Sequence, residues 1–295
     1  MDRSAMAPKT PIADAAWSEH RRILMDVAYR LLGSVTDAED AVQEAFTRLA
    51  AAPNDIEDVR AWLIVVVGRI CLDQLGSARR RREAYVGPWL PEPLVEGEDP
   101  ADQVTLDDSV RMALLVVLDR LSPAERVAFV LHDVFALSFD EVGAIVGRSN
   151  AASRQLASRA RQRVRAAEEV REPPVDVRVK RELAERFVVA CRNGDLDELT
   201  RILGEDVTLR ADGGGQVQAP RKPVHGRRRV AQIISGGAGR LGLSFVPAMV
   251  NGDHGGLIYD AEHELIGVVG LRFDAGSIVA IDLVANREKL AHLTG

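Results

Sequence analysis

Basic and amide side chains gather in residues 148–165, and their chemistry suits nucleic acid. Six arginines and no acidic residue lie in this segment. Arginine pairs with guanine edges, and asparagine or glutamine pairs with adenine. Arg154, Ser158 and Arg161 fall on one face at helical spacing. The segment predicts a DNA-reading helix, whose candidate contacts are Ser149, Asn150, Ser153, Arg154, Gln155, Ser158 and Arg161. The alternative is a helical hairpin with a solvated basic face.

A second basic segment runs from residue 60 to residue 82. An apolar stretch leads into four consecutive arginines, which suit backbone phosphates. Trp62 could stack on an unpaired base, although tryptophan in such a stretch is more often a core residue. The candidate DNA contacts here are Trp62, Arg69, Asp73, Arg79, Arg80 and Arg81.

An acidic face is expected on the segment from Asp37 to Leu49. Asp37, Asp40, Gln43 and Glu44 lie opposite an apolar stripe. Such a face repels DNA, so its partner would be a protein. The alternative is again a solvated helix face.

Composition limits the remaining choices. The chain has 295 residues and a net charge of −6, with two basic segments separated by the acidic residues 92–108. Cys71 and Cys191 lie too far apart in sequence for a multi-cysteine zinc motif and give no disulfide framework. No apolar run reaches the length of a membrane span and the start lacks a signal-peptide pattern. We therefore expect a cytoplasmic, reduced protein without metal or cofactor.

These segments require helices to position them. Apolar periodicity predicts helices over 17–32, from a capping box at Thr36 to about Ala51, and over 60–75 ending near Gly76. Four prolines in 86–100 indicate a linker, after which helices resume near residue 101. Ser122–Glu125 and Ser138–Glu141 are capping boxes that open the next helices, and Gly147 joins the second of these to a helix that Ser149 caps.

The character of the chain changes after Pro174. A helix over 179–193 and a second short helix precede strand-like runs at 207–211, 243–251, 255–259, 265–273 and 277–285. This order predicts an α+β domain with a curved antiparallel sheet after two all-α domains. The expected divisions are 1–14 tail, 15–85 first helical domain, 86–108 linker, 109–170 helix-turn-helix domain, 171–178 linker and 179–295 α+β domain.

Three stretches of the chain resemble a known protein family. YRLLGSVTDAEDAVQEAFTRLA and RAWLIVVVGRICLDQLGSARRRRE resemble region 2 of sigma factors, and LSPAERVAFVLHDVFALSFDEVGAIVGRSNAASRQLASRARQRV resembles region 4. The group with only these two domains is the extracytoplasmic-function (ECF) group. The resemblance implies binding of core RNA polymerase at its clamp and flap, with Asp37, Asp40, Gln43 and Glu44 at the clamp. It also implies reading of the downstream (minus ten) promoter element by region 2 and of the upstream (minus thirty-five) element by region 4.

A narrower resemblance covers the linker and the last domain. YVGPWLPEPLV is similar to the linker of ECF factors with an added SnoaL-like domain, and DGGGQ, PVHG and VNG stand where that domain has similar motifs. Gln216 replaces the usual Lys or Arg, Asn286-Arg287-Glu288-Lys289 replaces Asn-Pro-Asp-Lys, and Gly76 replaces a common Arg. The implied interdomain regulatory residues are Trp89, Leu90, Pro91, Glu92, Pro93, Asp212, Gly213, Gly214, Gly215, Asn286 and Lys289.

Three functions compete. The first is a sigma factor regulated in cis by its last domain, which would need no separate anti-sigma factor and no membrane. The second is a one-component helix-turn-helix regulator with a ligand-binding domain. The third is an enzyme in the last domain, with acid–base candidates Asp212, His225, His254, Asp260 and Asp282. Two basic segments and an acidic helix favour the sigma factor, and the isolated positions of the acid–base candidates argue against catalysis.

Overall fold

The computed structural model describes residues 11–52, 56–83, 85–96, 111–168 and 175–294. The described residues fall into two compact units. The helical unit holds residues 11–78 and 121–162, and the C-terminal unit holds residues 79–96, 111–120 and 163–294. Linker residues 85–96 therefore belong to the same unit as the last domain.

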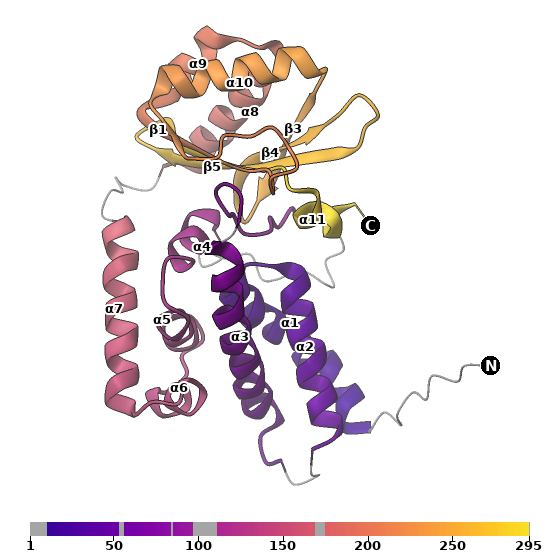
Figure 1. Cartoon of the computed structure of the whole chain (residues 1–295), viewed down its shortest axis with the longest axis vertical. Coiled ribbons are helices and arrows are strands. Elements are labelled where there is room, and N and C mark those ends of the chain that lie inside the picture. Colours follow the sequence, from indigo (N-terminus) through magenta and orange to yellow (C-terminus); the bar gives the residue numbers. More distant parts are fainter. Residues whose placement is uncertain (1–10, 53–55, 84, 97–110, 169–174, 295) are drawn as a thin grey trace, which may run out of the picture. The chain divides into compact units, whose positions relative to one another are not determined.

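Helices form the whole of the helical unit (Figure 1). They are α1 (Pro11–Leu32), α2 (Val35–Ala50), α3 (Val59–Glu83), α5 (Pro123–Phe129) with the π-helical turn η2 (Val130–Val134), α6 (Phe139–Val146) and α7 (Asn150–Glu168). The capping boxes at Ser122 and Ser138 are both present, which confirms the two predicted helix starts. Gly147 ends α6 in the left-handed conformation, at φ 65°, where a side chain would be strained.

Two predicted helix ends are wrong. The N-cap of α2 is Ser34 rather than Thr36, because α1 already ends at Gly33 and the Ser34 hydroxyl accepts from the Asp37 backbone N at 3.0 Å. The third helix does not stop at Gly76 but continues to Glu83. A glycine in a helix costs about 1 kcal/mol relative to alanine. That cost alone does not end a helix whose following arginines are good helix formers.

The C-terminal unit is a six-stranded sheet with helices. Its elements are α4 (Met112–Leu118), α8 (Val177–Asn193), α9 (Leu196–Ile202), β1 (Leu203–Asp212), β2 (Val224–His225), α10 (Arg227–Leu241), β3 (Ser244–Val250), β4 (Asp253–Tyr259), β5 (Leu265–Asp274), β6 (Ser277–Val284), α11 (Arg287–Leu290) and η3 (Ala291–Leu293). The strand order is β2-β1-β6-β5-β4-β3. The predicted antiparallel pairing holds except between β1 and β6, which run parallel. Parallel neighbours need a long connection, and here it includes α10 and the four strands β2 to β5.

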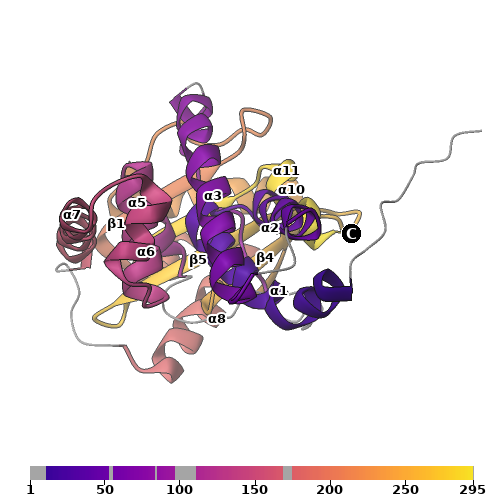
Figure 2. The same cartoon turned by 90° about the horizontal axis from the view of Figure 1, so that it is seen from below.

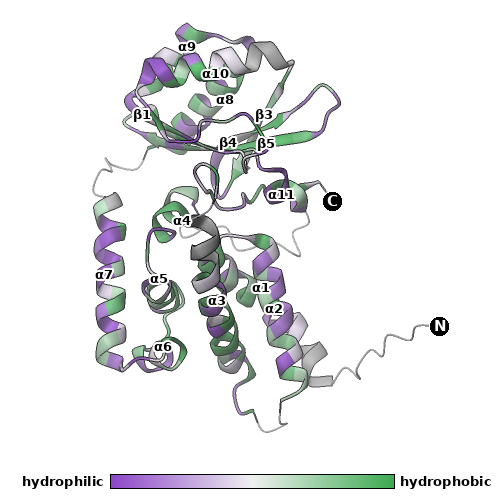
Figure 3. Cartoon of the chain, viewed as in Figure 1, coloured by the Kyte–Doolittle hydropathy of each residue, from purple (hydrophilic) through white to green (hydrophobic). Residues whose placement is uncertain are grey.

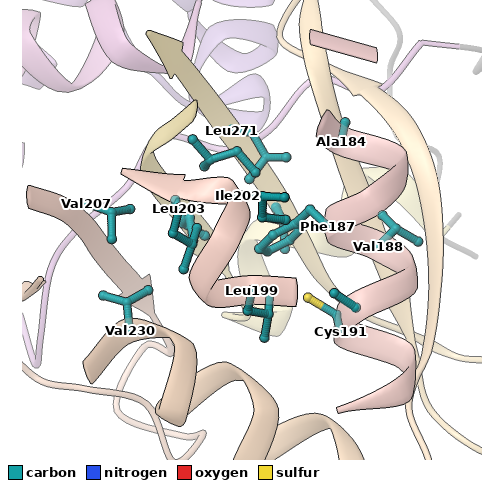
Figure 4. Packing of buried hydrophobic residues seen from close by; sticks show 14 of the residues in the cluster. Ala184, Phe187, Val188, Cys191, Leu199, Ile202, Leu203, Val207, Val230 and Leu271 are labelled. Carbon is teal, nitrogen blue, oxygen red and sulfur yellow. The ribbon is translucent and has the colours of Figure 1, made fainter. Parts of the chain in front are cut away.

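The sheet separates two apolar layers, because successive side chains of a strand point to opposite faces. On the helix-covered face, α8, α9 and α10 pack on residues of β1 and β5 such as Leu203, Val207 and Leu271 (Figures 1 and 4). Helix α10, which the sequence analysis did not predict, buries Val230 and Ala231 completely in this layer. On the linker-covered face, a smaller cluster joins the linker, α4 and α11 to the sheet. Its buried residues are Leu90, Val95, Met112, Val116, Val250, Val268, Val284 and Leu290.

No helix in the described ranges is both long and apolar enough to cross a membrane.

Candidate functional site

The helix-turn-helix segment places most, but not all, of its predicted DNA contacts on the surface. Gln155 and Ser158 are exposed on α7, and Ser149 caps the helix by accepting from the Ala152 backbone N at 3.3 Å. Ser153 is a correction. Its side chain is fully buried and its hydroxyl donates to the Ser149 carbonyl at 3.0 Å, so it packs α7 against α6 and faces no base. Figure 3 shows hydrophilic residues along much of α7.

The start of α7 is held in one conformation by a chain of side-chain contacts. Asn150 Nδ2 donates to Asp140 Oδ1 at 2.9 Å, and Arg154 Nε donates to Asn150 Oδ1 at 2.9 Å. The Arg154 guanidinium also lies over the Phe139 ring, 5.3 Å from its centroid. These contacts fix exposed groups suited to reading bases. Farther along, Arg161 Nε lies 2.8 Å from Asp133 Oδ1, which ties this arginine to η2.

The second basic segment contacts the helix-turn-helix within the helical unit. Arg69 is exposed, yet its Nη2 donates to the Ala144 carbonyl of α6 at 3.0 Å. Asp73 is exposed and Trp62 is half-buried. The predicted contacts Arg79, Arg80 and Arg81 lie on α3, but their side chains lie outside those that the structure describes.

The packing between α3 and α6 is close (Figures 1 and 2). A Cβ at Gly68 would lie 3.2 Å from Ile145, so any other residue there would require Ile145 to shift. A second contact joins α5 to α1. The fully buried Arg126 of α5 places its Nε and Nη2 each 3.3 Å from the Arg30 carbonyl of α1. Burial lowers the pKa of Arg126 to about 10, so the guanidinium stays charged at neutral pH. The two predicted promoter-reading segments are therefore packed against each other.

The predicted acidic face forms on α2. Asp40, Gln43 and Glu44 are exposed and Asp37 is half-buried. The opposite side of the helix is buried through Ala38, Ala41, Val42, Ala45, Phe46 and Leu49. Glu44 pairs with Arg48 one turn away, which partly neutralises the face and leaves Asp40 as its exposed charge.

The predicted interdomain residues come together around one buried carboxylate, on the linker-covered face of the sheet. Asp212, at the end of β1, is fully buried. Its Oδ1 accepts from the Tyr85 hydroxyl at 2.5 Å, and its Oδ2 accepts from the Leu90 backbone N at 2.8 Å and from Lys289 Nζ at 2.7 Å. We call Tyr85, Trp89, Leu90, Asp212, Asn286 and Lys289 the latch.

Lys289 is the cation of the latch. Its Nζ also donates to the Leu90 carbonyl and lies 4.0 Å from the centroid of the Trp89 ring. Asn286 Nδ2 donates to the Tyr85 hydroxyl at 2.9 Å. Burial and the hydrogen bond to Asp212 raise the pKa of Tyr85 far above its ordinary value. The linker is thus bound through its backbone at Leu90 and through two aromatic rings.

The glycines of the DGGG motif are required by this packing. Gly214 has φ 60°, and a Cβ on it would lie 2.7 Å from the Asn286 side chain. Gly215 has φ 75° and would meet Val86 of the linker at 3.2 Å, while Gly213 would meet the Val217 carbonyl at 3.0 Å. Any side chain at Gly214 would displace Asn286. Gln216, where the resembled family has Lys or Arg, is exposed.

The linker remains attached to the sheet beyond the latch. Leu94 and Asn251 exchange hydrogen bonds, at 2.8 Å between the Asn251 backbone N and the Leu94 carbonyl and at 3.2 Å between the Leu94 backbone N and Asn251 Oδ1. Val95 then forms an isolated antiparallel bridge with Val250 of β3. Pro91 and Pro93 are buried.

His292 contacts the linker at Glu92 and Pro93. His292 Nε2 lies 2.9 Å from the Pro93 carbonyl, and His292 Nδ1 lies 4.0 Å from the buried Glu92 carboxylate. Tyr85, Asn251 and His292 were not among the predicted regulatory residues. Tyr85 and Asn251 lie in the linker and VNG motifs, so a signal existed for them. His292 had none.

The acid–base candidates are dispersed. Asp282 forms a two-bond ion pair with Arg210, at 2.5 and 2.7 Å. His225 is exposed beside Thr208, and His254 is half-buried on β4. Among the described residues, no three His, Cys, Asp or Glu side chains gather as a metal site would require. Only Asp260 lines the cavity between the sheet and its helices.

Comparison with known proteins matches both helical segments. The model of Sigma-70 region 2 matches residues 16–81, and that of Sigma-70 region 4 matches residues 111–164. The chain is 45% identical over 269 residues to the ECF RNA polymerase sigma factor SigJ of Mycobacterium tuberculosis, covering 88% of this chain and 84% of that one. It is 39% identical to the probable ECF RNA polymerase sigma factor SigI of the same species, covering 97% of each. The crystal structure of M. tuberculosis SigJ superimposes with a TM-score of 0.76 and 37% identity, over 94% of this chain and 98% of that one.

Proposed function

The chain belongs to the extracytoplasmic-function sigma factors of RNA polymerase, and from this membership we propose that its C-terminal domain restrains promoter recognition in cis. Sigma factors bind core RNA polymerase and promoter DNA. The competing one-component regulator is not favoured, because the relatives that match nearly the whole chain are sigma factors. The restraint is our inference, and the latch around Asp212 is the observation that carries it.

The latch lies close in sequence to both promoter-reading domains. Tyr85 is separated from the end of α3 by one residue, so the latch holds the exit of region 2. Helix α4 lies at the start of the region 4 match, and its Met112 and Val116 pack on the same sheet face. Four residues separate α4 from α5. Since a residue spans at most about 3.6 Å, both promoter-reading domains are tethered by short connections to one surface.

Promoter recognition requires the two domains to separate. The minus ten and minus thirty-five elements are about 25 base pairs apart, which is roughly 85 Å at about 3.4 Å per base pair. In the helical unit the two segments are instead in direct contact, with Arg69 bonded to α6. The packed arrangement therefore cannot read both elements at once. Opening of the latch would free the linker to extend.

The proposal assigns the surfaces as follows. The acidic face of α2, with Asp37, Asp40, Gln43 and Glu44, binds the polymerase clamp. Region 2 contacts the downstream element through Trp62, Arg69, Asp73 and Arg79 to Arg81. Region 4 contacts the upstream element through Asn150, Arg154, Gln155, Ser158 and Arg161, and Ser149 holds the start of that helix. Ser153 is removed from this set because it is buried. With the restraint built into the chain, no separate anti-sigma factor is required.

Transcription by truncated proteins tests this proposal. Run-off transcription with core RNA polymerase would compare the full chain with proteins ending at Glu169 and at Asn286. The second truncation removes Lys289 and leaves the sheet. We expect it to initiate more strongly than the full chain, with binding to core polymerase measured in parallel to exclude loss of folding. Equal initiation by the full chain and the Asn286 truncation, at equal core binding, would contradict restraint by the latch.

A further inference from the structure

The helix-covered face of the sheet contains a cavity that neither the latch nor promoter recognition uses. Its volume is about 450 Å³, within the roughly 300–1,000 Å³ that small-molecule sites occupy. Its wall is mainly apolar and comes from α8, α10 and the sheet. Among the lining residues are Phe187, Leu209, Phe245, Ile258, Ile281 and Leu283. An apolar group of matching size would be well accommodated there.

Few polar groups reach this cavity, and they differ in what they can bind. Asp260 Oδ1 accepts from the backbone N of Glu262 at 3.1 Å and of Glu264 at 2.9 Å, so this oxygen is engaged in its own turn. Burial raises the pKa of the Cys191 thiol, which keeps this thiol neutral. Arg287 is exposed, and within the described part of the chain its guanidinium has no hydrogen-bond or ion-pair partner. Arg287 is therefore the cation that this cavity offers to a ligand.

We propose that this cavity binds a small apolar monocarboxylate, with its tail among the apolar side chains and its carboxylate on Arg287. A guanidinium matches a carboxylate with two parallel hydrogen bonds. The apolar wall selects an aliphatic or aromatic tail, and the position of Arg287 on the cavity lining places the charge where the tail ends. Arg287 is also the residue at which this chain differs from the proline of the Asn-Pro-Asp-Lys motif.

The cavity and the latch share a short stretch of chain. Arg287 lies between the latch residues Asn286 and Lys289. Ala211 and Ala285 line the cavity, and the next residue after each, Asp212 and Asn286, points to the latch on the other face. The alternation of side chains along a strand produces this arrangement in β1, whereas Ala285 and Asn286 follow the end of β6. A ligand that fixes Arg287 and Ala285 also fixes the backbone that carries the latch.

A loop offers a second connection. Residues 217–220 line the cavity and also a neighbouring cavity of about 460 Å³, whose other wall includes Val86 and Gly87 of the linker. Ligand binding would therefore tighten the latch. This coupling rests on the proposed restraint, whereas the binding site itself does not.

Calorimetric titration of the full chain tests the site. The probes are decanoate and decylamine, each below its micelle concentration, and decan-1-ol below its solubility limit. We expect decanoate to bind at least tenfold more tightly than decan-1-ol, and Arg287→Gln to remove that advantage. Arg228→Gln, which replaces an exposed arginine outside the cavity lining, is the matched control and should bind decanoate like the unmodified protein.

Three results would overturn the site. They are no decanoate binding by the unmodified protein, unchanged binding by Arg287→Gln, and tighter binding of decylamine, which would make Asp260 the anchor. Leu283→Trp, which fills the cavity, should abolish binding of all three probes. Its fold is checked by circular dichroism.

Hydrogen exchange tests the coupling separately. Decanoate should slow exchange of the Leu90 amide, which donates to Asp212, by several-fold in the unmodified protein and not in Arg287→Gln. Decanoate binding with unchanged exchange at Leu90 would overturn the coupling and leave the site standing. If the proposed restraint is wrong, run-off transcription will show it, and the calorimetric binding of decanoate will be unchanged.

Discussion

At the scale of single residues, Asp212 is the most constrained group of the C-terminal unit. A buried carboxylate needs partners that replace its lost hydration. Tyr85, Leu90 and Lys289 provide them, and all three contacts reach residues at least 77 positions away. Local patterns in a sequence cannot specify such a cluster. The sequence analysis therefore named Asp212 and Lys289 from the resemblance, and missed Tyr85.

Replacing the latch cation should open the linker. Lys289→Met keeps an unbranched chain beside Trp89 but leaves the Asp212 carboxylate buried without its counter-ion. Breaking such a pair costs about 3–5 kcal/mol, and each 1.4 kcal/mol is about tenfold. We expect amide exchange at Leu90 to accelerate roughly a hundredfold or more. Lys180→Met is the control, because it breaks another Lys–Asp pair, of 2.8 Å with Asp253, and leaves the latch residues unchanged. Equal effects of the two substitutions at Leu90 would contradict the role of Lys289.

At the scale of elements, the predictions were correct where residue type and spacing specify where a helix begins or ends. They were wrong where tertiary packing determines the helix or its buried face. The capping boxes at Ser122 and Ser138 and the left-handed Gly147 were predicted from residue type and spacing and are confirmed. Helix α10 was missed because Gly236 and Gly237 lower helix propensity, while burial on the sheet stabilises it. Ser153 was assigned to DNA because periodicity did not resolve the buried face of α7. That face runs through Ser153, Ala157, Ala160 and Val164.

The glycine inside α3 gives a test of helix energetics. Gly76 is exposed, and a Cβ there would meet nothing within 4 Å. Gly76→Ala should therefore stabilise α3 by about 1 kcal/mol, visible as a higher midpoint in urea unfolding followed by helical circular dichroism. Gly68→Ala is the contrasting variant, since its Cβ would lie 3.2 Å from Ile145, and it should lower the midpoint. A lower midpoint for Gly76→Ala would contradict the continuous helix.

Recognition of the upstream element should depend on the start of α7. Arg154→Ala removes the exposed guanidinium that Asn150 and Phe139 hold in place. A bidentate base contact is worth about 1–3 kcal/mol, so initiation should fall by roughly five- to hundredfold on promoters with the matching upstream element. Arg181→Ala, which replaces an exposed residue of α8, is the control. An unchanged rate for Arg154→Ala would remove this residue from the promoter contacts.

At the scale of the whole molecule, one chain carries both the promoter-reading helices and a domain that holds the linker between them. The sequence indicated this organisation through two basic segments, an acidic proline-rich linker and a final α+β region. The resemblance implied that this linker meets the last domain. Residue patterns alone could not show that residues 85–96 belong to the same compact unit as the sheet, because that depends on pairing across more than 100 residues.

Core-dependent run-off transcription by latch variants tests the central claim most directly. The full chain, Lys289→Met and Lys180→Met would be compared on one matching promoter at equal saturation of core polymerase. The account predicts several-fold more transcript from Lys289→Met than from the full chain, with Lys180→Met equal to the full chain. Transcript from Lys289→Met that is equal to or lower than that of the full chain would contradict a C-terminal domain that restrains initiation through the latch.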